Sequence, residues 1–197
     1  MLKNLIKMSE DKNLIIFKGS LFQLKTNYLV KPNKVKFFEK ATRPPGVRMI
    51  FMRDDSILLS KEFRREINDW DFRLPGGKVF DTIDEYLEAV ENHESLNQFV
   101  YEAVERESRE EVGITVNQKD IKIIHKSISG ASVNWDLYYC LVSDFTFNDE
   151  GQQLEEGEII DKPIFVNKDK VLDMCLNHEI GEDRTVAVLY RLLGKKK

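Results

Sequence analysis

A chain of 197 residues with 42% hydrophobic residues can bury the core of one domain of ordinary size together with a small appendage, which argues against a disordered protein. Its 30 basic and 34 acidic side chains give a net charge of -4, the wrong sign for a protein that binds the nucleic acid backbone. We therefore expect a folded protein with no nucleic acid partner.

Two further features bear on where the protein works. The cysteines, Cys140 and Cys175, lack the C-x-x-C spacing and the nearby histidine pair of a zinc site, so we interpret them as buried free thiols. The start, MLKNLIKMSEDKN, has too short an apolar stretch for a signal peptide, and no run approaches the length of a bilayer-spanning helix. The sequence therefore predicts a cytoplasmic protein that does not contact a membrane.

The first part of the chain is predicted to be a small antiparallel β unit. Residues 12–39 hold three runs of alternating hydrophobicity, separated by Gly19-Ser20 and by Lys31-Pro32-Asn33. The segment ATRPPG then interrupts regular structure, because paired prolines and a glycine end strands. We place a boundary there, between an N-terminal unit at 1–44 and a main domain at 45–197.

The main domain opens with three predicted strands and a helix. VRMIFM and SILLSKEF flank Arg53-Asp54-Asp55, which is typical of a β-hairpin. A short strand in DWDFR then runs into LPGG, whose glycines allow irregular backbone. In IDEYLEAVENHE, apolar residues recur at helical spacing between acids, which predicts an amphipathic helix with a solvated acidic face.

A second, longer helix is predicted from Leu96 to Val112, with Gly113 as its C-terminal stop. Strands are expected in IKIIHKSIS and WDLYYCLVS. FTFND then leads into the acidic loop GQQLEEGE, and a short strand is expected in IFV. KDKVLDMCLN and RTVAVLYRLL have helical patterns, and the final lysines, 195–197, are expected to carry no site.

Two acidic residues lie on the apolar face of the longer helix. A rotation of about 100° per residue places Glu107 and Glu111 on the same side as Val104. The same rotation places Arg106 and Arg109 on the opposite side of the helix. Unpaired buried carboxylates are costly, so either arginines from elsewhere in the chain or a bound divalent cation must compensate them. Oxygen ligands suit Mg²⁺ or Mn²⁺ better than zinc, and we favour the metal over a buried ion pair.

The sequence around this helix resembles the Nudix box, G-x5-E-x7-R-E-U-x-E-E-x-G-U, where U is aliphatic. Residues 106–114 match every fixed charge and the glycine of its second half, and Ser108 at an aliphatic position is the departure. Gly77 matches the first glycine, but about fifteen residues are inserted between the two halves. The first glutamate of the pattern is absent, because Ile83 or Gln98 stands in its place, depending on which half is counted from.

A wider resemblance is to the ADP-ribose pyrophosphatase branch of the Nudix hydrolases. It covers Phe63-Arg64, LPGG at 74–77, SGAS at 129–132 and EEGEII at 155–160, together with the three-stranded N-terminal unit and the closing GEDRTVAVLYRLL. That branch usually has an acidic residue just before its L-P-A-G segment. This chain has Arg73 there, so its recognition of the base or ribose can differ.

The resemblance implies a Nudix-type α/β/α sandwich with a mixed sheet, preceded by a small antiparallel unit that packs against a second subunit in a homodimer. It also implies magnesium-dependent hydrolysis, with manganese as an alternative ion, of ADP-ribose or a related nucleoside diphosphate sugar to a nucleoside monophosphate and a sugar phosphate. Two alternatives stay open: another nucleotide substrate, such as a nucleoside triphosphate or dinucleoside polyphosphate, and a non-catalytic module that senses nucleotide sugars.

Carried over residue by residue, the resemblance assigns the metal ligands. Glu107 and Glu111 would be the main ligands, Glu110 would bind another ion as part of the catalytic set, and the carbonyl oxygen of Gly76 would complete the site. Arg106 is expected to orient a glutamate and not to touch the substrate. Glycine at 76 allows the backbone to approach the ion closely.

The resemblance also directs attention to the acidic loop and to two arginines. A general base is expected in the loop, with Glu156 as first choice and Glu158 as second, because a carboxylate that binds no metal is available to take a proton. Arg64 is expected to bind the diphosphate through two hydrogen bonds, and ordinary surface ion pairing is the alternative. Arg73 and Trp70 are candidates for contact with sugar or base, although an aromatic residue at such a position more often belongs to the core.

Overall fold

The structure of the protein is a computed structural model, and it describes residues 13–31 and 34–194. The first twelve residues and the three final lysines, for which no site was expected, lie outside the described residues. By its internal contacts the chain forms two compact units. The first comprises the described residues up to Pro45 together with Phe80–Glu94 and Ile128–Asp136, and the second comprises Gly46–Val79, Ser95–Ser127 and the described residues from Leu137 onward.

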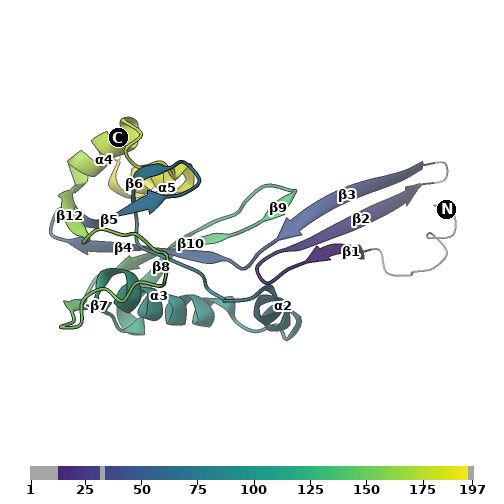
Figure 1. Cartoon of the computed structure of the whole chain (residues 1–197), viewed down its shortest axis with the longest axis horizontal. Helices are drawn as coiled ribbons and strands as arrows, with labels where there is room; N and C mark the ends of the chain where they lie inside the picture. The colour runs from purple at the N-terminus through teal and green to yellow at the C-terminus, as the bar shows by residue number, and fades with distance from the viewer. Residues whose placement is uncertain (1–12, 32–33, 195–197) are drawn as a thin grey trace. The chain divides into compact units, whose positions relative to one another are not determined.

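The first unit is built on an antiparallel sheet (Figure 1). Strands β1 (Asn13–Lys18), β2 (Gln23–Lys31) and β3 (Lys34–Thr42) pair in chain order, which confirms the predicted meander. A fourth strand, β9 (Val133–Asn134), pairs in parallel with β3. The sequence did not predict β9, because two residues are too few to show the alternation of a strand.

The first unit also contains the predicted amphipathic helix, α2 (Ile83–Glu91). Thr82 caps its N-terminus: the Thr82 hydroxyl accepts a bond from the Glu85 N–H at 3.2 Å, and the Glu85 carboxylate accepts one from the Thr82 N–H. This reciprocal arrangement satisfies two donors that a helix start leaves unpaired. The Ile83 N–H donates to the carbonyl of Ser20 at 2.7 Å, so the start of α2 is joined to the β1–β2 turn of the same unit.

The second unit is built on a mixed sheet with strand order β12-β5-β4-β10-β8. Strand β10 pairs in parallel with β4 and antiparallel with β8, and β6 pairs with β5. The predicted hairpin around Asp54-Asp55 is confirmed, with Met52 opposite Ile57. The strands are β4 (Gly46–Arg53), β5 (Ser56–Arg64), β6 (Asp69–Arg73), β8 (Ile121–Ser127), β10 (Leu137–Val142) and β12 (Ile164–Asn167).

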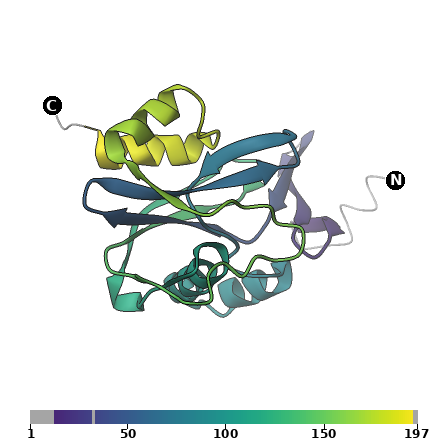
Figure 2. The same ribbon diagram turned by 60° about the vertical axis from the view of Figure 1, so that its left-hand side comes forward.

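Three helices cover this sheet. Figure 2 shows α3 (Leu96–Val112) on one side of the strands, with α4 (Lys168–Leu176) and α5 (Asp183–Leu193) on the other. The bounds of α3 are those predicted, and Gly113 ends it in the left-handed conformation, with φ 64° and ψ 36°. The predicted α/β fold with a mixed sheet is thereby confirmed. Among the described residues, no helix is long and apolar enough to cross a membrane.

The smaller elements of the second unit are a 3-10 helix, η1 (Gln118–Asp120), and a two-stranded sheet of β7 (Ile114–Thr115) and β11 (Thr146–Phe147). The core of this unit contains both cysteines as buried free thiols, as predicted. Burial raises the pKa of the Cys140 thiol to about 12, so this group stays protonated and inert at neutral pH.

Candidate active site

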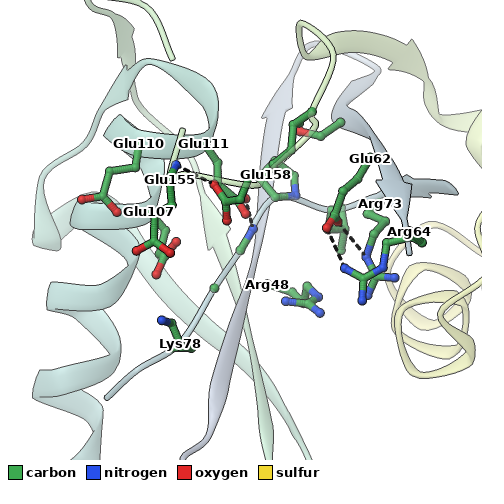
Figure 3. A pocket seen from close by; sticks show the side chains of 16 residues that line it. Arg48, Glu62, Arg64, Arg73, Lys78, Glu107, Glu110, Glu111, Glu155 and Glu158 are labelled. Atoms are coloured by element: carbon green, nitrogen blue, oxygen red, sulfur yellow. Dashed lines mark hydrogen bonds and ion pairs between the residues drawn. The ribbon is translucent and has the colours of Figure 1, made fainter. Parts of the chain in front are cut away.

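A cavity of about 180 Å³ in the second unit is lined by most of the predicted site residues. Figure 3 shows the glutamates of α3 on one side of this cavity and the arginines of β5 and β6 on the other, with Arg48 of β4 between them. The charged residues that line it are Arg48, Glu62, Arg64, Arg73, Lys78, Glu107, Glu110, Glu111, Glu155 and Glu158.

The LPGG segment brings backbone against the glutamates of α3. It is joined to β4 by two hydrogen bonds, from the Val47 N–H to the Gly77 carbonyl at 3.0 Å and from the Met49 N–H to the Pro75 carbonyl at 2.8 Å. A Cβ on Gly76 would lie 2.1 Å from the Val47 carbonyl oxygen, and one on Gly77 would lie 2.2 Å from the carboxylate carbon of Glu107. Side chains are therefore excluded at both glycines.

Glu111 lies on the inward face of α3, as the helical period predicted. It is only 9% exposed, and its carboxylate accepts a hydrogen bond from the Gly76 N–H at 2.6 Å. Burial raises the pKa of Glu111 to about 8, because the charged form loses its hydration and also lies near the charge of Glu107. The single backbone donor does not offset this cost.

Glu107 lies one turn earlier on the same face and is 8% exposed. Burial raises its pKa, and the nearby Arg106 guanidinium opposes that rise only in part. The helical period alone places Arg106 on the side away from Glu107, but the Arg106 Nη2 atom lies 3.1 Å from the Glu107 carboxylate, a contact that agrees with the expectation that Arg106 orients a glutamate. A long side chain can bend back across its own helix, and the same nitrogen donates to the Lys78 carbonyl at 2.6 Å.

The carboxylates of α3 that line the cavity fit a hard divalent cation. Glu107, Glu110 and Glu111 offer carboxylate oxygens, and carboxylates and backbone carbonyls are the ligands that magnesium prefers. In the described part of the chain, no three histidine, cysteine or acidic side chains lie close enough together to form a ready-made metal cluster. The three glutamates would therefore have to draw together around an ion.

Ser108 stands on α3 where the pattern has an aliphatic residue, and its contacts show how a serine is accommodated there. It is fully buried, and its hydroxyl donates to the Val104 carbonyl at 2.5 Å and contacts the Met49 sulfur at 3.1 Å. A helical serine that bonds to the carbonyl four residues earlier satisfies its own polar group.

The acidic loop places one of the two candidate bases at the cavity. Glu158 lines it, and the Glu158 carboxylate accepts a bond from the Glu155 N–H at 3.0 Å. Partial burial raises the pKa of Glu158, and the charges of Glu155 and Glu62 add to that rise. Glu156, the first choice from sequence, is exposed and is not among the residues that line the cavity.

Arg64 lines the cavity, but two carboxylates of its own chain hold it. Its Nη1 donates to Glu62 at 2.6 Å, its Nε donates to Glu66 at 2.7 Å, and its Nη2 also contacts Glu66. From the sequence, Arg64 was expected to bind the diphosphate, and ordinary surface ion pairing was the alternative. In this structure its donors face acidic side chains.

Arg73 and Arg48 belong to a buried network that the sequence did not reveal. Arg73 contacts Glu182 at 3.1 Å and Asp71 at 3.0 Å, and Arg48 binds Glu182 through Nε at 2.9 Å and Nη2 at 3.1 Å. Burial alone would raise the pKa of Glu182, but the Arg48 guanidinium attracts and bonds to its carboxylate and holds that pKa at about 2. A charged residue inside the apolar run VRMIFM was the available signal for Arg48.

Trp70 lies on the face of the β5–β6 hairpin opposite to Arg73. Side chains alternate along a strand, and Trp70 is opposite Phe63 while Arg73 is opposite Ser60. The Trp70 and Phe63 rings meet edge to face at 5.7 Å, and the Lys61 ammonium lies 5.4 Å from the Trp70 ring. Trp70 is therefore part of an aromatic cluster and does not line the cavity.

The chain is similar in fold to a solved structure of known class. It matches the crystal structure of an ADP compounds hydrolase with a TM-score of 0.64 and 21% sequence identity, over 94% of this chain and 95% of that chain. No protein-family model and no curated protein matches the sequence. At this level of identity the likeness shows a shared fold.

Proposed function

We propose that this protein is a divalent-metal-dependent hydrolase that cleaves the diphosphate of ADP-ribose or a related nucleoside diphosphate sugar. The products would be a nucleoside monophosphate and a sugar phosphate. The fold shared with an ADP compounds hydrolase supports a hydrolase of this general kind. The resemblance of residues 106–114 to the Nudix box supports the cleavage of a diphosphate.

One observation carries the proposal: two glutamates are buried on one face of α3, and the cations beside them do not offset the cost of that burial. Arg106 contacts Glu107 at 3.1 Å, yet burial still raises the pKa of Glu107. The Arg48 guanidinium attracts Glu111, but its Nε and Nη2 atoms are bonded to Glu182. A buried carboxylate whose charge is not compensated is strongly unfavourable. A divalent cation would compensate it, and this is why we favour a metal site over an internal ion pair.

In this proposal the glutamates of α3 and the acidic loop have different roles. Glu107, Glu110 and Glu111 would hold Mg²⁺ or Mn²⁺ together with the Gly76 carbonyl. The ion would neutralise charge on the diphosphate and favour deprotonation of water. Glu158 would accept the proton of the attacking water, because it lines the cavity and because partial burial, which raises its pKa, makes its carboxylate a stronger base.

The test is turnover of ADP-ribose with magnesium, followed by chromatography for AMP and ribose 5-phosphate. We expect both products, and none after treatment with EDTA. Glu111→Gln should lower kcat by at least about 100-fold, because loss of a direct ligand should cost no less than loss of a supporting residue. Glu102→Gln, an exposed change on the same helix, is the matched control and should leave kcat unchanged.

Two results would contradict this proposal, the first at the level of catalysis and the second at the level of the substrate. A protein that binds ADP-ribose with magnesium but releases no AMP would be a sensing module. Turnover of nucleoside triphosphates or dinucleoside polyphosphates in preference to sugar nucleotides would keep the diphosphate chemistry and change the substrate.

A further inference from the structure

Two cavities of the second unit meet at the candidate base. A second cavity, of about 190 Å³, is lined by residues 62–66 and 157–159 and shares Glu62, Arg64 and Glu158 with the first. In Figure 3, Glu158 lies between the glutamates of α3 and Glu62. Because Glu158 lines both spaces, close packing contributes little to its position, and the bonds of the acidic loop must hold it in place.

The acidic loop is bonded to neighbouring elements near both of its ends. Near its start, the Gln153 N–H donates to the Glu110 carbonyl of α3 at 2.7 Å. Just after its end, the Ile159 carbonyl accepts a bond from the Phe63 N–H of β5 at 2.9 Å. The stretch between these two bonds, residues 154–158, contains the candidate base.

Within this stretch, residues 155–158 form a turn that fixes the Glu158 carboxylate. The Glu158 N–H donates to the Glu155 carbonyl at 3.1 Å, and the Glu158 carboxylate accepts a bond from the Glu155 N–H at 3.0 Å. Gly157, the third residue of the turn, has φ 94°, a conformation that favours glycine at this position. The carboxylate is therefore fixed relative to the turn, and it moves whenever the turn moves.

Arg65 joins this turn to the end of β5. It directly follows Arg64, the last residue of β5, and its Nη2 atom donates to the Gly157 carbonyl at 3.1 Å. Arg65 and Gly157 both line the second cavity, so this bond connects the turn to β5 where packing is loose. Arg65 does not line the first cavity, and it is therefore not placed to touch a diphosphate held by the glutamates of α3.

We propose that Arg65 is a positioning residue. By holding the Gly157 carbonyl, it keeps the turn, and with it the Glu158 carboxylate, where Glu158 accepts the proton of the attacking water. This inference rests on the proposed function, in which Glu158 is the general base. A base must lie within hydrogen-bonding reach of the proton that it takes, so a displacement of about 1 Å is enough to slow the reaction.

The first test removes the donors of Arg65. Arg65→Met should lower kcat for ADP-ribose with magnesium by about three- to tenfold, the effect of one lost hydrogen bond, and leave KM unchanged. Arg65→Lys should keep at least about half of the wild-type kcat, because an ammonium group also donates to a carbonyl. Arg191→Met, which removes an exposed guanidinium that lines neither cavity, is the matched control. A raised KM with unchanged kcat in Arg65→Met would overturn the proposal.

A double-mutant cycle tests whether Arg65 acts through Glu158. If Arg65 positions this carboxylate, Arg65→Met should change kcat by less than about twofold in the Glu158→Gln protein, because the base that it positions is already lost. An undiminished effect of Arg65→Met in the Glu158→Gln protein would overturn the proposal, because Arg65 would then act on the reaction by another route.

Hydrogen exchange separates this inference from the proposed function, because it measures the loop without turnover. In Arg65→Met, the Glu158 amide should exchange at least about threefold faster than in the wild type, and the amides of α3 should exchange at the wild-type rate. Faster exchange in a protein that hydrolyses no sugar nucleotide would support the hold of Arg65 on the turn and contradict the proposed function. An unchanged rate at Glu158 would overturn the positioning role, even in a protein that hydrolyses ADP-ribose.

Discussion

At the scale of single residues, Glu111 links the stability of the protein to pH. Its folded pKa is about 8, and an unfolded glutamate titrates near about 4.3. Between these values the folded protein holds a proton that the unfolded chain releases. The stability contributed by this protonated group is therefore complete below about pH 4 and is lost as the pH rises toward 8.

We expect the melting temperature in EDTA to fall as the pH is raised from 5 to about 8, by the equivalent of a few kcal/mol at most, since each pKa unit corresponds to about 1.4 kcal/mol. Glu111→Gln should largely remove this fall, because glutamine does not titrate. Scanning calorimetry of both proteins across this range measures the effect. Addition of magnesium at pH 8 should restore stability to the wild type. A melting temperature that rises with pH in EDTA would argue against the buried acid.

Glu66 is expected to compete with the substrate for Arg64. Glu66 is exposed and bonds to the Arg64 Nε at 2.7 Å, so a diphosphate must displace it. Glu66→Gln should lower KM by about two- to fivefold and leave kcat unchanged, because an exposed ion pair contributes about 0.2–1 kcal/mol. Steady-state kinetics with ADP-ribose measures this, with Glu88→Gln on an exposed helical face as the control. An unchanged KM would indicate that Arg64 does not bind the diphosphate.

The sequence predicted the inward glutamates but not what surrounds them. The period of a helix fixes the face of Glu107 and Glu111, so their burial follows from local geometry. The contact between Arg106 and Glu107 does not follow from local geometry, because a long side chain has several rotamers. The pairing of Arg48 with Glu182 joins residues that are 134 positions apart, and no local pattern reports such a contact.

At the scale of elements, the long helix and the long strands followed from periodicity. Gly113 set the end of α3, and the alternation in SILLSKEF gave β5. The two-residue strands β7, β9 and β11 were not resolved as separate elements, because their pairing depends on tertiary contacts. The inserted helix α2 folds with the first unit, which explains why it can separate Gly77 from Arg106 and leave α3 intact.

A prediction at the scale of elements concerns the acidic loop before β12, which contains Glu158. Glu158→Gln should lower kcat by about 100-fold or more and spare magnesium binding, because removal of a general base slows proton transfer by about 10²–10⁴-fold. Glu156→Gln should have little effect, because Glu156 does not line the cavity. Single-turnover kinetics and manganese titration separate the two properties. The reverse order of effects would return the base to Glu156, the residue that the sequence favoured.

At the scale of the whole molecule, the first unit carries large apolar side chains that are more than half exposed. Leu14 and Ile15 are both more than half exposed, and neighbours on a strand point to opposite faces of the sheet. Phe17, Phe37 and Phe38 are also more than half exposed. Apolar surface of this extent usually marks an interface. A homodimer formed through this unit remains our prediction.

We expect light scattering to give the mass of a dimer in solution. Phe17→Glu should shift the mass toward the monomer, because a charge within an apolar interface opposes association. Ile67→Glu, at an exposed apolar position in the second unit, should leave the dimer intact. A wild-type protein that is monomeric at micromolar concentration would contradict the prediction.

The parallel pairing of β9 with β3 has a consequence for synthesis on the ribosome. Roughly 90 residues separate the end of β3 from β9, and at about 5–20 residues per second they take roughly 5–18 s to translate. During that interval the last two residues of β3, Ala41 and Thr42, lack their neighbouring strand, in a unit that also exposes phenylalanines. An open strand edge readily pairs with other chains. Slower translation, or crowding of polysomes at high expression, should therefore favour insoluble protein, and a chaperone that shields the emerging hairpin should favour soluble yield.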